Sequence, residues 1–274
     1  MSKNNRIQQL FQQRDPDHKI MSLFITAGYP DPAQTVALIR ELESSGADMI
    51  ELGMPFSDPL ADGPTIQNAS KVALEQGVHM DSIFGMVREL RRYSEIPIVL
   101  MGYINPVLRY GLEKFFQTAS ESGVDGVIIP DVPPGELPEL TGLTDTCGID
   151  PIYLVAPNTS DERMKTIDEY SRGFIYCVSV TGVTGARDGE EVDRSVRKFI
   201  QRVRTNVTKN PVLIGFGIRS HKDAMNISKE VEGFIVGSAL IDVIDKYYPH
   251  EDWIARAGSF VKALRSGEKT EIAE

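Results

Sequence analysis

The sequence predicts a (β/α)8 barrel that forms a single domain over residues 1–274. Eight short apolar runs recur along the chain, amphipathic helical segments separate them, and no Gly-x-Gly-x-x-Gly motif follows the first run. Runs that are rich in Ile, Val, Leu and Phe and too short for helices are typical of buried parallel strands. Regular alternation of strands with helices indicates βαβ units. Without a dinucleotide motif, it favours a closed barrel over an open doubly wound sheet.

Each apolar run predicts one strand. In chain order, the predicted strands are Ile20–Thr26, Met49–Gly53, Ile98–Met101, Gly126–Ile129, Ile152–Val155, Phe174–Val178, Val212–Phe216 and Phe234–Gly237. The helices between them are predicted from apolar residues at helical spacing, and the first ends at a glycine, Gly46. The predicted helices are Pro32–Ser45, Met80–Tyr93, Glu113–Ser122, Pro138–Thr146, Asp161–Ser171, Glu191–Thr205, Lys222–Glu230 and Glu251–Arg265.

Composition and charge exclude several classes of protein. A net charge of −10 disfavours a general nucleic-acid binder, which needs clustered Lys and Arg. Two cysteines do not make a disulfide framework, and the four histidines lack metal-ligand spacing, so no metal site is expected. The polar N-terminus does not resemble a signal peptide, and no apolar run reaches the ~20 residues that span a membrane. We therefore expect a cytoplasmic protein that does not bind membranes.

Catalytic residues of such barrels lie at the C-terminal ends of the strands and in the following loops. Side chains alternate along a strand, so Glu51 faces the barrel interior if Ile50 and Leu52 face the helices. A buried carboxyl group often has a raised pKa and can act as an acid or base near neutral pH. The alternative, an outward Glu51 paired with a helix Lys or Arg, is equally compatible with strand parity. In the next loop, Asp62 can project over the barrel mouth, whereas Asp58 is expected to serve turn chemistry or packing.

Two further regions suggest a phosphate site. The loop after the sixth strand, residues 179–189, is rich in Gly, Thr and Ser and suits a closing lid. A flexible surface loop would have the same composition. Glycine turns end the seventh and eighth strands, where barrels often bind phosphate through backbone amides. The glycines could instead serve close packing of helices on strands. We favour phosphate binding, because the two turns occur together and in the order expected of a phosphate-binding barrel. Because no strand ends in lysine and no metal ligands cluster, we expect acid–base chemistry by carboxylates.

The motifs together resemble the tryptophan synthase α subunit family from about residue 5 to residue 265. The longest is ELGMPFSDPLADGPTIQ at residues 51–67, which is highly specific. Shorter similarities are FITAGYP at 24–30, DVP at 131–133, GVTG at 182–185 and GFGI at 215–218. The glycine turns alone fit many phosphate-binding barrels. Gly102 and Ile104, and Val180-Thr181 in the predicted lid, depart from common family members, which puts the details of the pocket lining in doubt.

The resemblance implies a retro-aldol cleavage of indole-3-glycerol phosphate to indole and glyceraldehyde 3-phosphate. It implies Glu51 as the acid–base at carbon 3 and the side-chain hydroxyl, and Asp62 as the partner of the ring N–H. It further implies substrate contacts from Phe24, Met101, Tyr176, Thr184 and Phe216, with Thr184 orienting Asp62. The implied phosphate cradle is Gly185, Gly217, Gly237 and Ser238.

The resemblance also implies a partner. Family members work as αββα heterotetramers in which the β subunit carries pyridoxal phosphate, so no cofactor is expected in this chain. By that analogy Asp58, Asn105, Asp131 and Pro133 face the β subunit. The sequence is equally compatible with a stand-alone indole-producing enzyme that needs no β subunit. Sugar-phosphate isomerisation is a more distant alternative. A non-catalytic subunit is disfavoured because Glu51, Asp62 and Tyr176 are all present.

Overall fold

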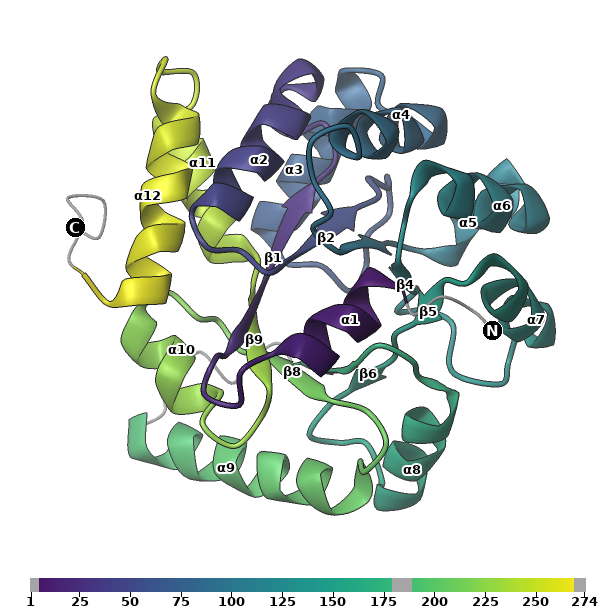
Figure 1. The fold of residues 1–274 in the computed structure, drawn as a ribbon, viewed down its shortest axis with the longest axis vertical. Coiled ribbons are helices and arrows are strands. Elements are labelled where there is room, and N and C mark those ends of the chain that lie inside the picture. The colour runs from purple at the N-terminus through teal and green to yellow at the C-terminus, as the bar shows by residue number, and fades with distance from the viewer. Residues whose placement is uncertain (1–4, 179–188, 269–274) are drawn as a thin grey trace.

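The computed structural model describes residues 5–178 and 189–268, with only the backbone described at 189–194. Nine parallel strands form one sheet in the order β5-β4-β3-β2-β1-β9-β8-β7-β6, and helices surround it (Figure 1). The strands are β1 Ile20–Thr26, β2 Met49–Gly53, β3 Ile98–Met101, β4 Gly126–Ile128, β5 Asp150–Pro151, β6 Leu154–Val155, β7 Ile175–Val178, β8 Val212–Gly215 and β9 Gly233–Val236. The predicted barrel is confirmed.

The fifth strand of the barrel is divided in two. β5 pairs with β4 and lies just before the predicted strand Ile152–Val155, whereas β6, the C-terminal half of that predicted strand, pairs with β7. The linking residues keep the ladder continuous, because Ile152 N–H donates to Val127 O at 2.9 Å and Tyr176 N–H donates to Tyr153 O at 3.1 Å. The barrel therefore closes through a single stretch of chain. Because β5 and β6 share one strand position, the nine described strands occupy the eight positions of a (β/α)8 barrel.

Twelve α-helices and one short 3-10 helix, η1 (Pro32–Gln34), accompany the described strands. The α-helices are α1 Arg6–Gln13, α2 Thr35–Ser44, α3 Pro64–Glu75, α4 Met80–Leu90, α5 Ile104–Tyr110, α6 Leu112–Ser122, α7 Pro138–Cys147, α8 Asp161–Tyr170, α9 Gly189–Asn206, α10 His221–Ile227, α11 Ser238–Tyr247 and α12 Trp253–Ser266. Helices α1, α3, α5 and α11 are not among the eight predicted helices, because the sequence was divided into one helix per strand.

Strand parity divides the apolar residues into two layers. Inside the barrel, one cluster contains Ile20, Met49, Val99, Ile128, Ile152, Phe174, Leu213 and Ile235. The alternate strand residues, such as Ile50 and Leu52, belong to a larger outer cluster with the helices. This arrangement is the one that parity predicted around Glu51, with Met49 inside and its two flanking residues outside.

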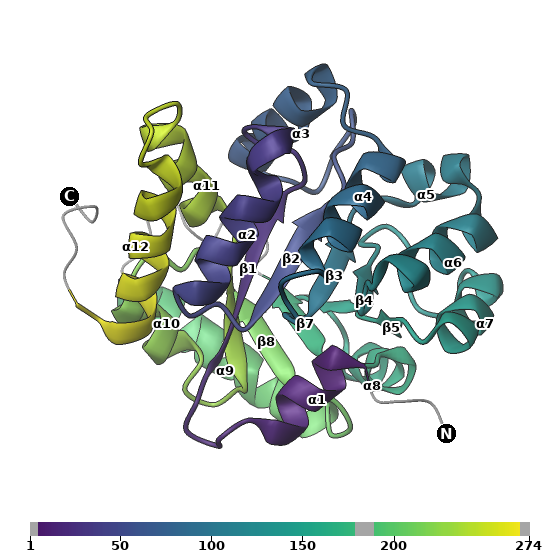
Figure 2. The same ribbon diagram turned by 45° about the horizontal axis from the view of Figure 1, so that its top comes forward.

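Helix α1 closes the N-terminal end of the barrel. It places Ile7 in the inner cluster, and the ring of Phe11 lies 6.2 Å from that of Phe174. Figure 2 shows α1 at one end of the strands and the segment leading into α3 at the other. Within the described ranges, no helix combines the length and apolarity that crossing a membrane requires, and no three metal-ligating side chains cluster.

Candidate active site

Glu51 lies inside the barrel, on β2, and its side chain is completely buried. Its Oε1 accepts a 2.8 Å hydrogen bond from the Ser22 hydroxyl, whereas Oε2 has no partner among the described residues. Burial disfavours the charged form and raises the pKa of Glu51 to about 7, with the Ser22 hydrogen bond acting in the opposite direction. A carboxyl group with this pKa is poised to give and accept protons at neutral pH.

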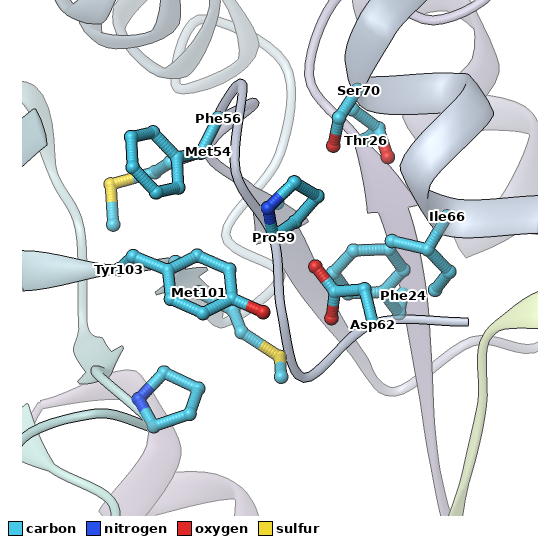
Figure 3. Close-up of a pocket in the computed structure, with 13 residues that line it drawn as sticks. Phe24, Thr26, Met54, Phe56, Pro59, Asp62, Ile66, Ser70, Met101 and Tyr103 are labelled. Atoms are coloured by element: carbon cyan, nitrogen blue, oxygen red, sulfur yellow. The ribbon is translucent and has the colours of Figure 1, made fainter. Parts of the chain in front are cut away.

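Asp62 lies at the C-terminal ends of the barrel strands, in the loop that joins β2 to α3. Its pKa is raised by burial, against the effect of a hydrogen bond from Tyr103. The hydroxyl of Tyr103 also accepts a hydrogen bond from Ala61 N–H at 2.9 Å, so one side chain fixes two consecutive loop residues. Figure 3 shows the Tyr103 hydroxyl directed toward Asp62, with Phe24 and Met101 beside them.

Tyr176, on β7, interacts electrostatically with both Glu51 and Asp62. Its pKa is raised well above the ordinary value by burial and then by the negative charges of Glu51 and Asp62. Gly215, on the adjacent strand β8, leaves room for this ring, because a Cβ at residue 215 would lie 2.9 Å from the Tyr176 hydroxyl. Three titratable side chains from separate segments therefore interact within one region of the barrel.

A cavity opens above these residues at the C-terminal ends of the strands. Phe24, Met101, Tyr176 and Asp62 line it, as the resemblance implied, together with Leu154 and Asn158. Glu51 does not line the cavity: its hydrogen bond to Ser22 draws the carboxyl group toward the N-terminal end of β1. Phe216 does not line it either, because its ring packs on the outside against Phe199 on α9, 6.1 Å away.

The far end of the cavity is suited to an anion. Gly217 and Gly237 line it with Ser238, the first residue of α11, where unpaired backbone N–H groups and the helix dipole favour negative charge. Gly217 adopts φ +59°, a conformation that glycine reaches without strain. Arg219 also lines the cavity, and its guanidinium lies 3.4 Å from the carboxylate of Asp242. Thr184 and Gly185 lie outside the described residues.

Known sequences and structures resemble the chain over most of its length. The sequence pattern of the tryptophan synthase alpha chain matches residues 10–268. The tryptophan synthase alpha chain of Geobacter sulfurreducens is 46% identical over 248 residues, which cover 90% of this chain and 92% of that protein. The one from Citrifermentans bemidjiense is 44% identical over 254 residues, which cover 93% and 94%. The chain belongs to the tryptophan synthase alpha chain family.

The structural comparison agrees with this assignment. The crystal structure of tryptophan synthase subunit alpha from Legionella pneumophila matches with a TM-score of 0.86 and 38% identity, covering 95% of this chain and 97% of the other. The structure of Mycobacterium tuberculosis tryptophan synthase matches with a TM-score of 0.86 at 34% identity, covering 97% and 98%. As a member of this family, the protein is a lyase that cleaves indole-3-glycerol phosphate in tryptophan biosynthesis.

The four residues expected at the partner interface of this alpha chain lie on the surface or at its edge. Asp58 is exposed beside Ser57, and Asn105 lines a surface groove with Ser57 and Phe56. Asp131 is exposed, but its carboxylate also accepts a hydrogen bond from Ile104 N–H at 3.0 Å and so caps the start of α5. Pro133 is half-buried two residues further along the same loop.

Three polar residues of the site were not singled out in the sequence. Ser22 was read only as part of an apolar strand, although parity along β1 places it inside the barrel with Ile20 and Phe24. Tyr103 and Arg219 occupy loops whose shape no local pattern specifies. Gly102, noted as a departure from common family members, lies against Met54: a Cβ there would be 2.9 Å from the Met54 Cβ.

Proposed function

We propose that Glu51 and Asp62 are the two catalytic carboxyl groups of the cleavage reaction, Glu51 as the acid–base and Asp62 as the partner of the ring N–H. One observation carries the proposal: both carboxyl groups have raised pKa values and both act electrostatically on Tyr176, whose ring packs against the inner apolar cluster. Two carboxyl groups with raised pKa values beside one tyrosine suit proton transfer at neutral pH. The cavity that Asp62, Tyr176 and Phe24 line has room for an aromatic ring at this point.

In the proposed reaction, protonated Glu51 gives its proton to carbon 3 of the indole ring. The ring nitrogen becomes electron-poor, and the carboxylate of Asp62 stabilises the positive charge that develops at its N–H. Glu51, now a carboxylate, accepts the proton of the side-chain hydroxyl as the carbon–carbon bond breaks. The bond electrons return to the ring, which leaves as indole, and the aldehyde product is glyceraldehyde 3-phosphate. Glu51 ends protonated, as it began.

For this role Oε2 of Glu51 must become accessible from the cavity while Oε1 keeps the Ser22 hydrogen bond, because the carboxyl group is completely buried. The substrate phosphate is expected at Gly217, Gly237 and Ser238, where the N-terminus of α11 points into the same cavity. Phosphate at that end and the ring near Asp62 would place the reacting side chain between them. We extend this cradle to Gly185, and the orientation of Asp62 to Thr184, on family resemblance.

The test is the rate of indole release from indole-3-glycerol phosphate. Glu51→Gln keeps the size of the side chain and its ability to accept the Ser22 hydrogen bond, but it cannot transfer a proton. We expect kcat to fall by at least ~10²-fold, the lower range of acid–base catalysis, and we expect a comparable loss for Asp62→Asn. Glu75→Gln, which changes an exposed carboxylate on α3, is the matched control. Full activity of Glu51→Gln would refute the assignment.

We further propose that the chain pairs with a tryptophan synthase β subunit as a cytoplasmic αββα heterotetramer, with the pyridoxal phosphate chemistry in the β subunit. The contact face would include Asp58, Asn105, Asp131 and Pro133. The groove beside Phe56 and the exposed Leu60 give this face apolar surface that a partner could cover. Gel filtration with and without the β subunit, combined with the indole assay, tests this. Fast indole release by the isolated chain would instead favour a stand-alone enzyme.

A further inference from the structure

Ser22 is a polar residue in an otherwise apolar layer of the barrel. Its register partners on the two neighbouring strands are Met49 and Ile235, both members of the inner apolar cluster. The side chain is completely buried, and its hydroxyl donates to Glu51 Oε1 at 2.8 Å. Burying a hydroxyl among hydrocarbon side chains is unfavourable unless it forms a hydrogen bond. The carboxyl group of Glu51 satisfies this requirement.

The register explains why the two side chains meet. On β1, Phe24 is the residue opposite Glu51, and Ser22 precedes it by two positions on the same inward face. The Glu51 carboxyl group therefore reaches down past Phe24 to form the bond. Within the described part of the chain, this is the hydrogen bond that the carboxyl group makes, and Oε2 is left without one.

We propose that Ser22 is a positioning residue for Glu51, which holds Oε1 and thereby assigns the transferable proton to Oε2. A hydroxyl that donates to Oε1 keeps that oxygen as the acceptor, so the proton of the neutral carboxyl group resides on the other oxygen. The same hydrogen bond stabilises the carboxylate and offsets part of the cost of its burial. The inference rests on the proposed acid–base role of Glu51.

The surroundings of Glu51 offer little else that sets its charge state. From β7, the titratable group that faces it is Tyr176, and Asp62 from the β2–α3 loop acts on Tyr176 in turn. The other strands around the barrel present apolar inward side chains, including Val99 on β3 and Leu213 on β8. Loss of the Ser22 hydroxyl should therefore raise the pKa of Glu51.

The experiment compares Ser22→Thr with Ser22→Val in the full chain. The two side chains have the same shape, and only threonine retains a hydroxyl. The free-enzyme pKa of Glu51 appears in the pH dependence of kcat/KM for indole release. If the protonated form starts the reaction, activity falls as pH rises through about 7 in the parent. We expect Ser22→Thr to keep this alkaline limb and Ser22→Val to move it upward by about one pH unit.

A second measurement does not depend on activity. The carbonyl stretch of the protonated Glu51 carboxyl group, identified by infrared difference against Glu51→Gln, is titrated in both Ser22 variants. We expect a higher midpoint in Ser22→Val than in Ser22→Thr. The inference is overturned if either the infrared midpoint or the alkaline limb coincides in the two variants while Glu51→Gln is inactive. An active Glu51→Gln would instead refute the proposed function, and the infrared comparison would still test the hydrogen bond.

Discussion

Glu51 occupies a position that suits catalysis and opposes stability. It is a completely buried carboxyl group with one hydrogen bond, and its second oxygen has no described partner. Leaving a buried polar atom unpaired costs free energy that a folded protein has little reason to tolerate outside a functional site. The same burial raises its pKa into the neutral range, so the destabilising feature is also the chemically useful one.

This trade-off predicts a pH-dependent gain in stability for Glu51→Gln. Burial raises the pKa of Glu51 to about 7 in the folded protein, whereas the unfolded chain ionises this side chain near its ordinary pKa of 4.5. Between these values the unfolded state binds fewer protons, so the contribution of Glu51 to stability is lost as pH rises. We expect both proteins to be equally stable near pH 4.5 and the variant to be more stable by roughly 3 kcal/mol at pH 8.

Urea unfolding at several pH values measures this difference. Glu75→Gln, whose carboxylate is exposed, serves as the control and should follow the parent at every pH. If Glu51→Gln also tracks the parent from pH 4.5 to pH 8, then the folded protein does not hold this carboxyl group neutral.

Tyr103 leads to a second prediction at the same scale. Its hydroxyl links Ala61 N–H to the Asp62 carboxylate, and its ring lies 5.4 Å from that of Phe56. Tyr103→Phe keeps the ring contact and removes both hydrogen bonds. We expect kcat/KM to fall roughly tenfold, the effect of losing one net hydrogen bond to a charged group. Because this bond lowers the pKa of Asp62, the acidic limb of the profile should move to higher pH. An unchanged profile would show that Asp62 is oriented by other groups.

Among the elements, α11 has the clearest link to function. It begins at Ser238 directly after the Gly237 turn, and its N-terminus faces the cavity. Ser238→Asp adds a negative charge where the substrate phosphate is expected, while Ser238→Asn has the same shape without the charge. We expect Ser238→Asp to raise KM about tenfold or more above Ser238→Asn, because two anions would compete for one site. Its Tm should not fall, since an acidic residue favours a helix N-terminus.

Steady-state kinetics and thermal unfolding of the two variants show whether Ser238 lies beside the phosphate or serves packing. Equal KM values for Ser238→Asp and Ser238→Asn would place the phosphate elsewhere in the cavity. A lower Tm for the aspartate variant would indicate a packing role for Ser238.

The elements differ in how far the sequence could predict them. Strands β1, β2 and β3 were predicted to the residue, because buried parallel strands appear as continuous apolar runs between turn signals. Helix α1 was missed because Ile7 is its one buried residue, with Leu10 and Phe11 partly buried, and nothing local shows that they close a barrel. Helix α5 is short and contains Pro106, which weakens a helical pattern.

The site was predictable to a similar degree. Parity left an inward and an outward Glu51 open, the structure shows it inside the barrel, and the family motif drew attention to Asp62, Tyr176 and the glycine turns. The partners that tune them, Ser22 and Tyr103, are distant in sequence from the groups they contact, and only the register of β1 against β2 or the packing of a loop brings them close. Phe216 stays a prediction as a substrate contact: its ring lies beside Phe199, a direction that depends on how β8 ends.

At the scale of the whole molecule, the two ends of the barrel have different tasks. Asp62, Tyr176 and the candidate phosphate groups line the cavity at the C-terminal ends of the strands, with Glu51 beneath it on β2, whereas the N-terminal end is closed by α1 and fixed by polar contacts. One of these is the pairing of Asp125 with Arg6 and Arg91. Barrels generally divide function and stability in this way. Changes at the closed end should therefore alter stability without altering catalysis.

Ile7→Ala tests this division. Ile7 is completely buried in the inner cluster, and its replacement leaves a cavity beneath Gly126 and Ile152. Truncating a buried isoleucine costs about 2–5 kcal/mol, which corresponds to a decrease in Tm of roughly 5–15 °C for a chain of this size. Well below the new Tm, kcat/KM should stay within about twofold of the parent, because catalysis depends on the opposite end of the barrel. Gln13→Ala, at the exposed end of α1, controls for changes in the helix itself. A large fall in kcat/KM at a temperature where Ile7→Ala is fully folded would mean that the inner apolar layer transmits strain from α1 to Glu51, and the two ends would then act as one unit.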